Sequence, residues 1–190
     1  MTNNTILFYD TETTDMPNWK IPSDDVTQPH LVQLAAILCD ADTKEIIQSI
    51  DLIIKPEGWE SSKEALETHG ITEEFALEHG IPEPYVVGML ELMRGDALRV
   101  AYNKTFDQRI IRIAYKRYCK EELIDSWAEK DDHKCAMQMA RKAMGGKNPK
   151  LIDAYKHFTG KELENAHSAM ADTLACMEVY FAIREQHPEI

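Results

Sequence analysis

The stretch ILFYDTETT, residues 6–14, constrains the fold more than any other part of the chain. Its apolar run predicts a buried β-strand, and it leads directly into acids on alternate positions, Asp10 and Glu12. Successive side chains of a strand point to opposite faces, so these two carboxylates lie on the same face and close together. Carboxylates this close repel and raise each other's pKa. A fold that contains this strand therefore needs a reason to keep both acids.

The remaining sequence predicts an α/β domain. Strands are expected at 5–10, 31–39, 46–54, 97–102 and, briefly, within 121–133. Helices are expected at 62–69, from Thr72, from Pro82 to about Met93, and at 105–118, 134–144, 149–158 and 166–186. Strands followed by helices interleaved with one more strand indicate a mixed five-stranded sheet flanked by helices. No repeat or long linker divides the chain, so we expect one domain, 1–190.

The composition narrows the class of protein. A net charge of −12 by itself argues against a nucleic-acid partner, although acids that hold divalent cations become attractive to phosphate. The basic residues are clustered, at 104–120 and around the Gly145-Gly146 pair at 141–150, and either cluster is a solvated helix face or a phosphate-binding surface. Four scattered cysteines without a CxxC pair indicate a reducing, cytoplasmic location. No segment predicts a membrane span or a signal peptide, so no membrane partner is expected.

Two further acids and one histidine stand out by position. Asp107 lies one turn into the helix after the fourth expected strand, and Asp172 lies in the last helix, five residues after His167. The apolar side of that helix must pack on the sheet, which brings Asp172 near Asp10 and Glu12. Four hard oxygen ligands suit Mg²⁺ or Mn²⁺ rather than zinc, and two such ions can clamp a scissile phosphodiester. A histidine at the edge of this site is suited to accept a proton from the attacking water.

Three motifs in order make the chain resemble the DEDDh, or DnaQ-like, 3′–5′ exonucleases of the ribonuclease H-like superfamily. The family's Asp-x-Glu-Thr-Thr stands at 10–14, its His-Asn-x-x-Phe-Asp appears as Tyr-Asn-Lys-Thr-Phe-Asp at 102–107, and its His-x-Ala-x-x-Asp stands at 167–172. A less diagnostic His-Gly-Ile-Thr stands at 69–72. The family includes the proofreading subunit of bacterial DNA polymerase III, ribonuclease T and oligoribonuclease. His167, rather than a tyrosine at that position, places the chain in the histidine subgroup.

The resemblance implies a role for each matching residue. The metal ligands would be Asp10, Glu12, Asp107 and Asp172, with His167 as the general base and two cations, Mg²⁺ or Mn²⁺, as cofactors. The residues expected to bind the last nucleotide are Thr11, Thr13, Thr14, His69, Ile71, Tyr102, Asn103 and Phe106. Phe106 either stacks on the terminal base or packs in the core. Tyr102 replaces the family's usual histidine, which affects only a substrate contact. Trp19, in the long loop 15–30, either covers the terminal base or seals the sheet edge.

The expected function is release of 5′-mononucleotides from free 3′ ends, mainly of single-stranded DNA, because a 3′ nucleotide must be drawn into a pocket. One alternative keeps the chemistry and acts on RNA or short oligoribonucleotides, since no residue settles the sensing of the 2′-OH. Another alternative is a non-catalytic domain that binds nucleic acid or docks on a polymerase. The resemblance to proofreading and repair members favours DNA and allows a DNA polymerase or repair complex as a partner.

Overall fold

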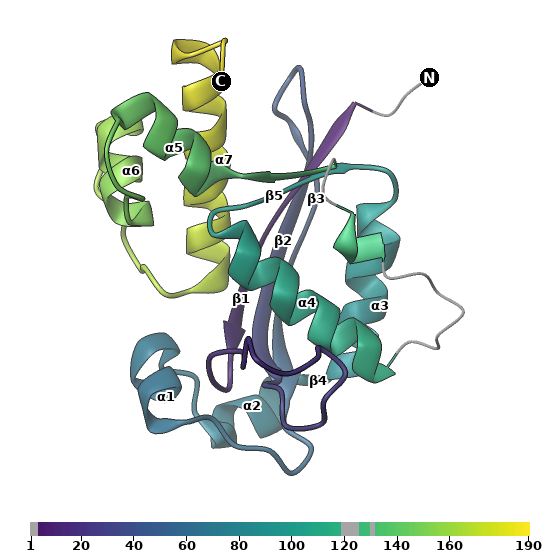
Figure 1. Ribbon diagram of the computed structural model, residues 1–190. Coiled ribbons are helices and arrows are strands. Elements are labelled where there is room, and N and C mark those ends of the chain that lie inside the picture. The colour runs from purple at the N-terminus through teal and green to yellow at the C-terminus, as the bar shows by residue number, and fades with distance from the viewer. Residues whose placement is uncertain (1–3, 119–125, 130–131) are drawn as a thin grey trace.

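A mixed six-stranded sheet forms the centre of the computed structural model, which describes residues 4–118, 126–129 and 132–190 (Figure 1). The strands are β1 (Thr5–Thr13), β2 (Leu31–Asp40), β3 (Ile46–Lys55), β4 (Ile81–Pro82), β5 (Leu98–Ala101) and β6 (His133–Cys135), in the order β4-β3-β2-β1-β5-β6. β1 to β3 are antiparallel neighbours, whereas β5 and β6 run parallel to β1. The predicted α/β class and mixed sheet are confirmed.

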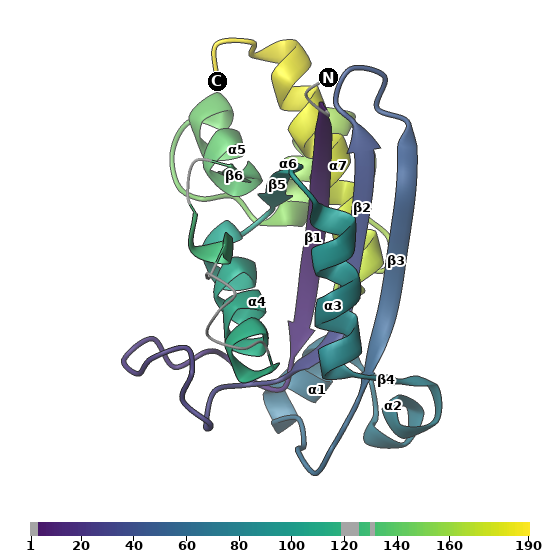
Figure 2. The same cartoon turned by 90° about the vertical axis from the view of Figure 1, so that its right-hand side faces the viewer.

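Helices cover both faces of this sheet (Figures 1 and 2). α3 (Glu83–Arg94) and α4 (Lys104–Tyr118) lie on one face, and α5 (Ala136–Met144), α6 (Leu151–Thr159) and α7 (Ala169–Gln186) lie on the other. α1 (Lys63–His69) and α2 (Glu73–His79) lie at the end of the sheet where β1 finishes. Among the described residues, no helix is long and apolar enough to cross a lipid bilayer.

The side chains of β1 divide between two hydrophobic cores. Leu7 and Tyr9 pack with residues of α3 and α4, whereas Ile6 and Phe8 pack with residues of α7. A strand that is buried on both faces has apolar side chains at successive positions, which explains the apolar run from Ile6 to Tyr9. The same alternation directs Asp10 and Glu12 toward the face of the sheet that α7 covers.

Several predicted element boundaries are wrong, for physical reasons. The sheet has one strand more than the five expected, because β4 pairs with β3 over only two residues and is too short to give a periodic pattern. β1 continues to Thr13, so the paired acids lie within the strand rather than after it. α7 begins at Ala169 instead of 166, because Asn165 and His167 adopt positive φ angles of 55° and 71°. Residues 121–125, 130 and 131 of the expected brief strand lie outside the described residues, and β6 begins at His133.

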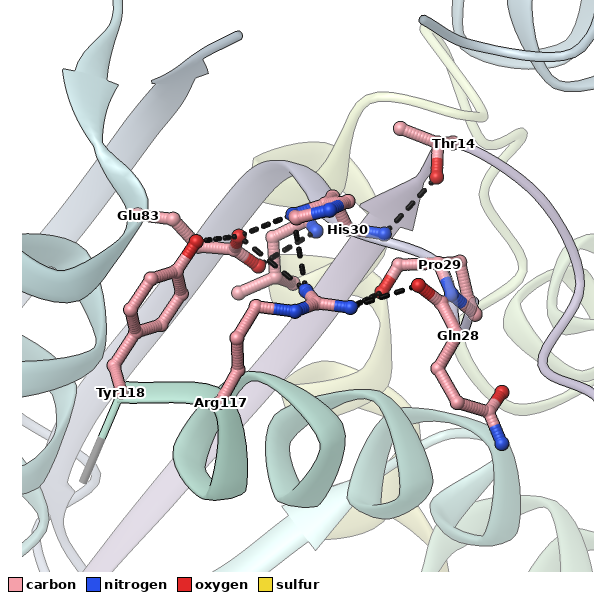
Figure 3. A network of polar contacts seen from close by, with 8 residues as sticks. Thr14, Gln28, Pro29, His30, Glu83, Arg117 and Tyr118 are labelled. Carbon is pink, nitrogen blue, oxygen red and sulfur yellow. Dashed lines mark hydrogen bonds and ion pairs between the residues drawn. The ribbon is translucent and has the colours of Figure 1, made fainter. Parts of the chain in front are cut away.

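A buried carboxylate joins three parts of the fold (Figure 3). Glu83, at the start of α3, is 1 % exposed, and its Oε1 accepts the Leu31 N–H at 3.0 Å. Its Oε2 lies 2.7 Å from Nδ1 of His30 and accepts the Tyr118 hydroxyl at 2.9 Å. Arg117 Nη1 lies 3.6 Å from the same oxygen. Glu83 therefore ties the start of β2 to the end of α4.

The same network closes the base of the loop that follows β1 (Figure 3). The Thr14 N–H donates to the His30 carbonyl, and the His30 N–H donates to the Thr14 hydroxyl, both at 3.0 Å. Arg117 Nη2 donates to the carbonyls of Gln28 and Pro29 at 2.7 and 3.3 Å. The two ends of the loop are thus fixed next to each other, directly beyond the acidic end of β1.

We expect Glu83→Ala to lower the free energy of unfolding by about 3–5 kcal/mol, because it leaves the Arg117 charge and the Leu31 N–H without their buried acceptor. Urea denaturation measures this change. The matched control is Glu67→Ala, which removes an exposed pair between Lys63 and Glu67 at 3.7 Å and should change stability by less than about 0.5 kcal/mol. Equal effects of the two substitutions would contradict the role of this network.

Candidate active site

Three carboxylates from two distant segments converge at the end of β1. Asp10 and Glu12 come from β1 and Asp172 from the first turn of α7, and one oxygen of each lies within 4.8 Å of the others. The two β1 acids therefore lie on one face of the sheet, the face that α7 covers, as predicted. Oxygen atoms at this spacing are close enough to bind one cation together.

Asp107 approaches the group of three from the other face of the sheet. It is 3 % exposed in the first turn of α4, directly after β5, which is the parallel neighbour of β1. Its Oδ1 accepts a hydrogen bond from the Thr11 hydroxyl at 2.9 Å. Its charge is close enough to contribute to the raised pKa of Asp10. The Thr11 hydroxyl thus orients an acid, and contact of this residue with a nucleotide stays a prediction.

The four acids have raised pKa values, mainly because they are buried. Burial raises the pKa of Glu12 to about 8, and repulsion from Asp172 and Asp107 adds to it. Burial also raises the pKa of Asp107 to about 7, although the Thr11 hydrogen bond opposes the shift. The pKa of Asp10 lies well above its usual range, through burial and then through repulsion from the other three acids. Burial raises the pKa of Asp172 as well.

The donor set fits a divalent cation. Oδ1 of Asp172 is buried without a hydrogen-bond partner, and an oxygen in this state is destabilised unless something positive approaches it. The group contains only carboxylate oxygens, which hard cations such as Mg²⁺ and Mn²⁺ prefer. A bound cation would remove the repulsion that raises these pKa values.

His167 lies in the loop immediately before α7, with an exposed side chain and a φ of 71°. Its backbone N–H donates to Oδ2 of Asp172 at 3.3 Å, which fixes the loop to the acid. His167 and Asp172 line the same cavity, of about 510 Å³, together with Tyr102 and Asn103. The predicted base is therefore next to the acids and faces a space large enough for part of a nucleotide.

A second cavity, of about 190 Å³, lies on the Glu12 side of the acids. Thr13, His69 and Phe106 line it. Nδ1 of His69 accepts the Ile71 N–H at 3.0 Å, so a neutral ring carries its proton on Nε2, which is buried without a partner. Burial lowers the pKa of His69 and so favours this neutral form. His69 therefore lines the cavity, while its Nε2–H is buried in the wall without a hydrogen-bond partner.

The predicted nucleotide-binding residues occupy different places. Phe106 packs against the core of the α3–α4 face and also lines the smaller cavity, so its core packing is observed and its stacking on a terminal base stays a prediction. Tyr102 is buried, and its hydroxyl donates to the Pro149 carbonyl at 2.9 Å. Ile71 lines a separate cavity with Trp59 and Leu66. Thr14 is held in the loop-base network.

The loop residue Trp19 is 53 % exposed and therefore does not seal the sheet edge. Its ring faces the Arg109 guanidinium of α4, with 5.9 Å between the guanidinium carbon and the ring centroid. Arg109 also donates to the Ile21 carbonyl at 2.6 Å. The loop is thus held against α4, and Asp15 and Met16 at its start line the smaller cavity.

Sequence analysis missed several residues that line the two cavities. Met16, Ser62, Ala65 and Thr68 line the smaller one, and their contact depends on how α1 folds back toward β1, which no motif indicates. Asn148, Lys150 and Leu151 line the larger one, and the basic cluster around the Gly145-Gly146 pair was a usable signal for them. Gln33 was also missed, although a glutamine within the apolar run LVQLAAIL was a visible irregularity.

Comparisons with solved structures place this architecture among known exonucleases. *Escherichia coli* exonuclease I in complex with a dT13 oligonucleotide is 23 % identical, with a TM-score of 0.78 over 98 % of this chain and 42 % of that one. The zinc-bound form of its single-stranded DNA complex is 23 % identical, with a TM-score of 0.75 over the same shares. Exonuclease I of *Methylocaldum szegediense* is 23 % identical, with a TM-score of 0.76 over 97 % and 41 %.

The chain therefore spans about two fifths of the length of these proteins, and at this identity the likeness establishes the fold. No curated protein sequence matches the chain. The family model RNase_T, described as "Exonuclease", matches residues 7–180, a range that includes all four acids and His167. The chain belongs to the RNase_T exonuclease family, as the resemblance of its three motifs indicated.

Proposed function

We propose that residues 1–190 form a single metal-dependent 3′–5′ exonuclease domain that releases 5′-mononucleotides from free 3′ ends, mainly of single-stranded DNA. One observation carries the proposal: the acids lie between two cavities. Glu12 lines the smaller cavity and Asp172 the larger one, and their carboxylate oxygens lie within 4.8 Å of each other. A phosphodiester that joins one nucleotide in each cavity would lie against the acids.

We propose two cations, Mg²⁺ or Mn²⁺, as cofactors. Asp10, Glu12 and Asp172 would hold one of them, and Asp107 would help Asp10 to hold the other. The bound metals would activate a water molecule and stabilise the leaving oxygen. The zinc-bound form of *E. coli* exonuclease I supports a divalent cation in a protein of this fold.

His167 is the proposed general base. It lies in the loop that is fixed to Asp172 and lines the larger cavity, so its ring can approach a water molecule at the acids. Transfer of the proton from that water to the imidazole would leave the nucleophile beside the phosphate. The exposed position of the ring provides a path for the proton to leave to solvent.

The smaller cavity is the proposed site of the terminal nucleotide. Phe106 provides an aromatic wall, and the His69 ring lines the same cavity. The larger cavity would hold the preceding nucleotide, beside Tyr102, Asn103 and the positive charge of Lys150. Lys150 thus attracts a phosphate locally, in a chain whose net charge of −12 repels a polyanion overall. Binding roles for Thr13, Thr14 and Ile71 stay predictions.

Single-stranded DNA is the proposed substrate because the terminal nucleotide must leave any duplex to enter a cavity. The complex of *E. coli* exonuclease I with dT13 supports this choice. RNA is the second candidate, since the exposed Asn103 in the larger cavity is a polar side chain able to contact a 2′-hydroxyl. Association with a DNA polymerase or repair complex and a cytoplasmic location stay predictions.

The chelated protein should lose stability as pH rises. Glu12 and Asp107 keep their protons in the folded state up to pH values near their pKa values of about 8 and about 7, whereas the unfolded chain loses them near pH 4. The folded state therefore binds more protons in this window, and the free energy of unfolding falls between about pH 5 and pH 8. Differential scanning fluorimetry in EDTA, for wild type and Glu12→Gln, should show a smaller fall for the variant.

At pH 8, saturating Mg²⁺ should raise the melting temperature of the wild type by about 5–10 °C, which corresponds to about 2.7 kcal/mol at a hundredfold excess over Kd. The gain should be smaller for Glu12→Gln and unchanged for Glu78→Gln, an exposed acid on α2. If neither Mg²⁺ nor Mn²⁺ changes the melting temperature of the wild type, the proposed metal site is wrong.

Nuclease assays on 5′-labelled single-stranded DNA test the reaction. Wild type with Mg²⁺ should shorten the strand from its 3′ end and release mononucleotides, and EDTA should stop the reaction. Asp10→Asn should be inactive because it removes a charge from the proposed metal site. His167→Gln should lower kcat by about 10²-fold, the usual contribution of a general base, whereas Glu78→Gln should retain wild-type rates. Activity in EDTA would contradict the mechanism.

Matched DNA and RNA oligonucleotides of one sequence separate the two candidate substrates. We expect kcat/KM to be at least about tenfold higher for single-stranded DNA, a difference of about 1.4 kcal/mol in transition-state binding. If RNA is degraded as fast or faster, the second candidate replaces the first. An Asn103→Ala variant then reports whether this side chain contributes to the discrimination.

A further inference from the structure

Gln33 is a buried polar residue in an apolar strand and lies opposite the acids. It is 7 % exposed, and in the antiparallel pairing of β1 with β2 it faces Glu12 directly. Both ends of its amide are used. Oε1 accepts the Ala169 N–H at 3.2 Å, and Nε2 donates to Oδ1 of Asp51 at 2.7 Å. These bonds connect β2, β3 and α7 through one side chain.

The bond to Ala169 replaces a missing helix cap. Ala169 is the first residue of α7, and the first N–H groups of a helix have no partner within it. A side chain at the N-cap position usually accepts one of these hydrogens, but the N-cap residue Ser168 makes no such bond. Gln33 provides the acceptor from the neighbouring strand instead, so β2 holds the start of α7.

This bond lies between the two functional residues of the α7 segment. His167 is two residues before Ala169 and Asp172 is three residues after it. The loop before the helix contains Asn165 and His167 with positive φ angles, a conformation that non-glycine residues keep only when surrounding contacts enforce it. The start of α7 must therefore be fixed from outside the loop.

We propose that Gln33 is a positioning residue that sets the distance between Glu12 on β1 and Asp172 on α7, and with it the placement of His167. The inference rests on the proposed nuclease function. Gln33 lines neither cavity beside the acids, so it acts through the residues that do. A displacement of about 1 Å in such a site is enough to lower a rate about 10²-fold.

Asp51 of β3 determines which way the Gln33 amide points. The Gln33 NH₂ group donates to the Asp51 carboxylate, which leaves the amide oxygen for Ala169. The reversed amide would place NH₂ against the Ala169 N–H, two donors facing each other, and would place its oxygen against the carboxylate. Asp51 thus has a part in positioning α7, although its side chain is exposed at the surface of β3.

Steady-state kinetics and metal titration of the full chain test the proposal. Gln33→Met keeps the volume and removes both hydrogen bonds, and it should lower kcat about 10–10²-fold with KM within about twofold. It should also raise the Mn²⁺ concentration that gives half of the thermal shift, a measurement that needs no substrate. Gln48→Met, an exposed glutamine on β3, is the matched control and should leave both quantities unchanged.

A double variant distinguishes positioning from a general loss of stability. In Gln33→Glu with Asp51→Asn, the new carboxylate still accepts the Ala169 N–H, and the new amide at position 51 donates to it. The reversed pair should recover most of the kcat lost in Gln33→Met. The Mn²⁺ midpoint is compared only between wild type, Gln33→Met and Gln48→Met, because the new carboxylate opposite Glu12 changes cation affinity by its charge. Asp51→Asn alone should behave as wild type, because its amide oxygen still accepts from Gln33.

The outcomes separate this inference from the proposed function. An active wild type with an unchanged Gln33→Met would overturn the positioning role. A Gln33→Met variant with reduced kcat, an unchanged Mn²⁺ midpoint and no recovery in the double variant would also overturn it. If the wild type has no nuclease activity, the proposed function fails, and a Mn²⁺ midpoint raised in Gln33→Met but not in Gln48→Met still supports positioning of Asp172.

Discussion

Electrostatic repulsion among buried carboxylates at the end of β1 is the constraint on which the rest of the structure depends. Burial and mutual repulsion raise the pKa values of Asp10 and Glu12, and Oδ1 of Asp172 is buried without a partner. An isolated fold would gain stability by losing these charges. Their convergence is therefore best explained by a cation, and the fold around them is organised to hold the acids in place against their repulsion.

Asp107 and the helix that carries Asp172 are each held by a contact from another segment. Thr11 of β1 donates to Asp107 of α4, and Gln33 of β2 accepts from the first N–H of α7, which carries Asp172. Beyond the acids, Glu83 and its partners close the base of the loop that begins at Thr14 (Figure 3). The Thr11 and Gln33 hydrogen bonds thus connect the helices on the two faces of the sheet to the site, and the buried Glu83 carboxylate fixes the loop beyond the end of β1.

Local sequence signals predicted most elements well. The predicted starts of α1 and α2, at residue 62 and at Thr72, are the N-cap residues of these helices, because a cap is a contact within a few residues. The start of α7 was predicted three residues too early, because Asn165 and His167 adopt positive φ angles that the helical pattern does not indicate, and Gln33 of the sheet holds the first N–H of the helix. β4 was not predicted because a strand of two residues is too short to show an alternating pattern of apolar and polar side chains.

The sequence by itself determined the chemistry of the site. The alternation of a strand places Asp10 and Glu12 on one face, and the apolar side of the last helix brings Asp172 to that face. Only the tertiary structure decided how the site is supported and what surrounds it. Thr11 binds an acid, Ile71 lines a separate cavity and Gln33 caps a helix 136 positions away, because each role depends on a contact between segments far apart in the chain. Residue periodicity specifies which face a side chain takes, whereas the partner on that face is fixed only when the layers pack.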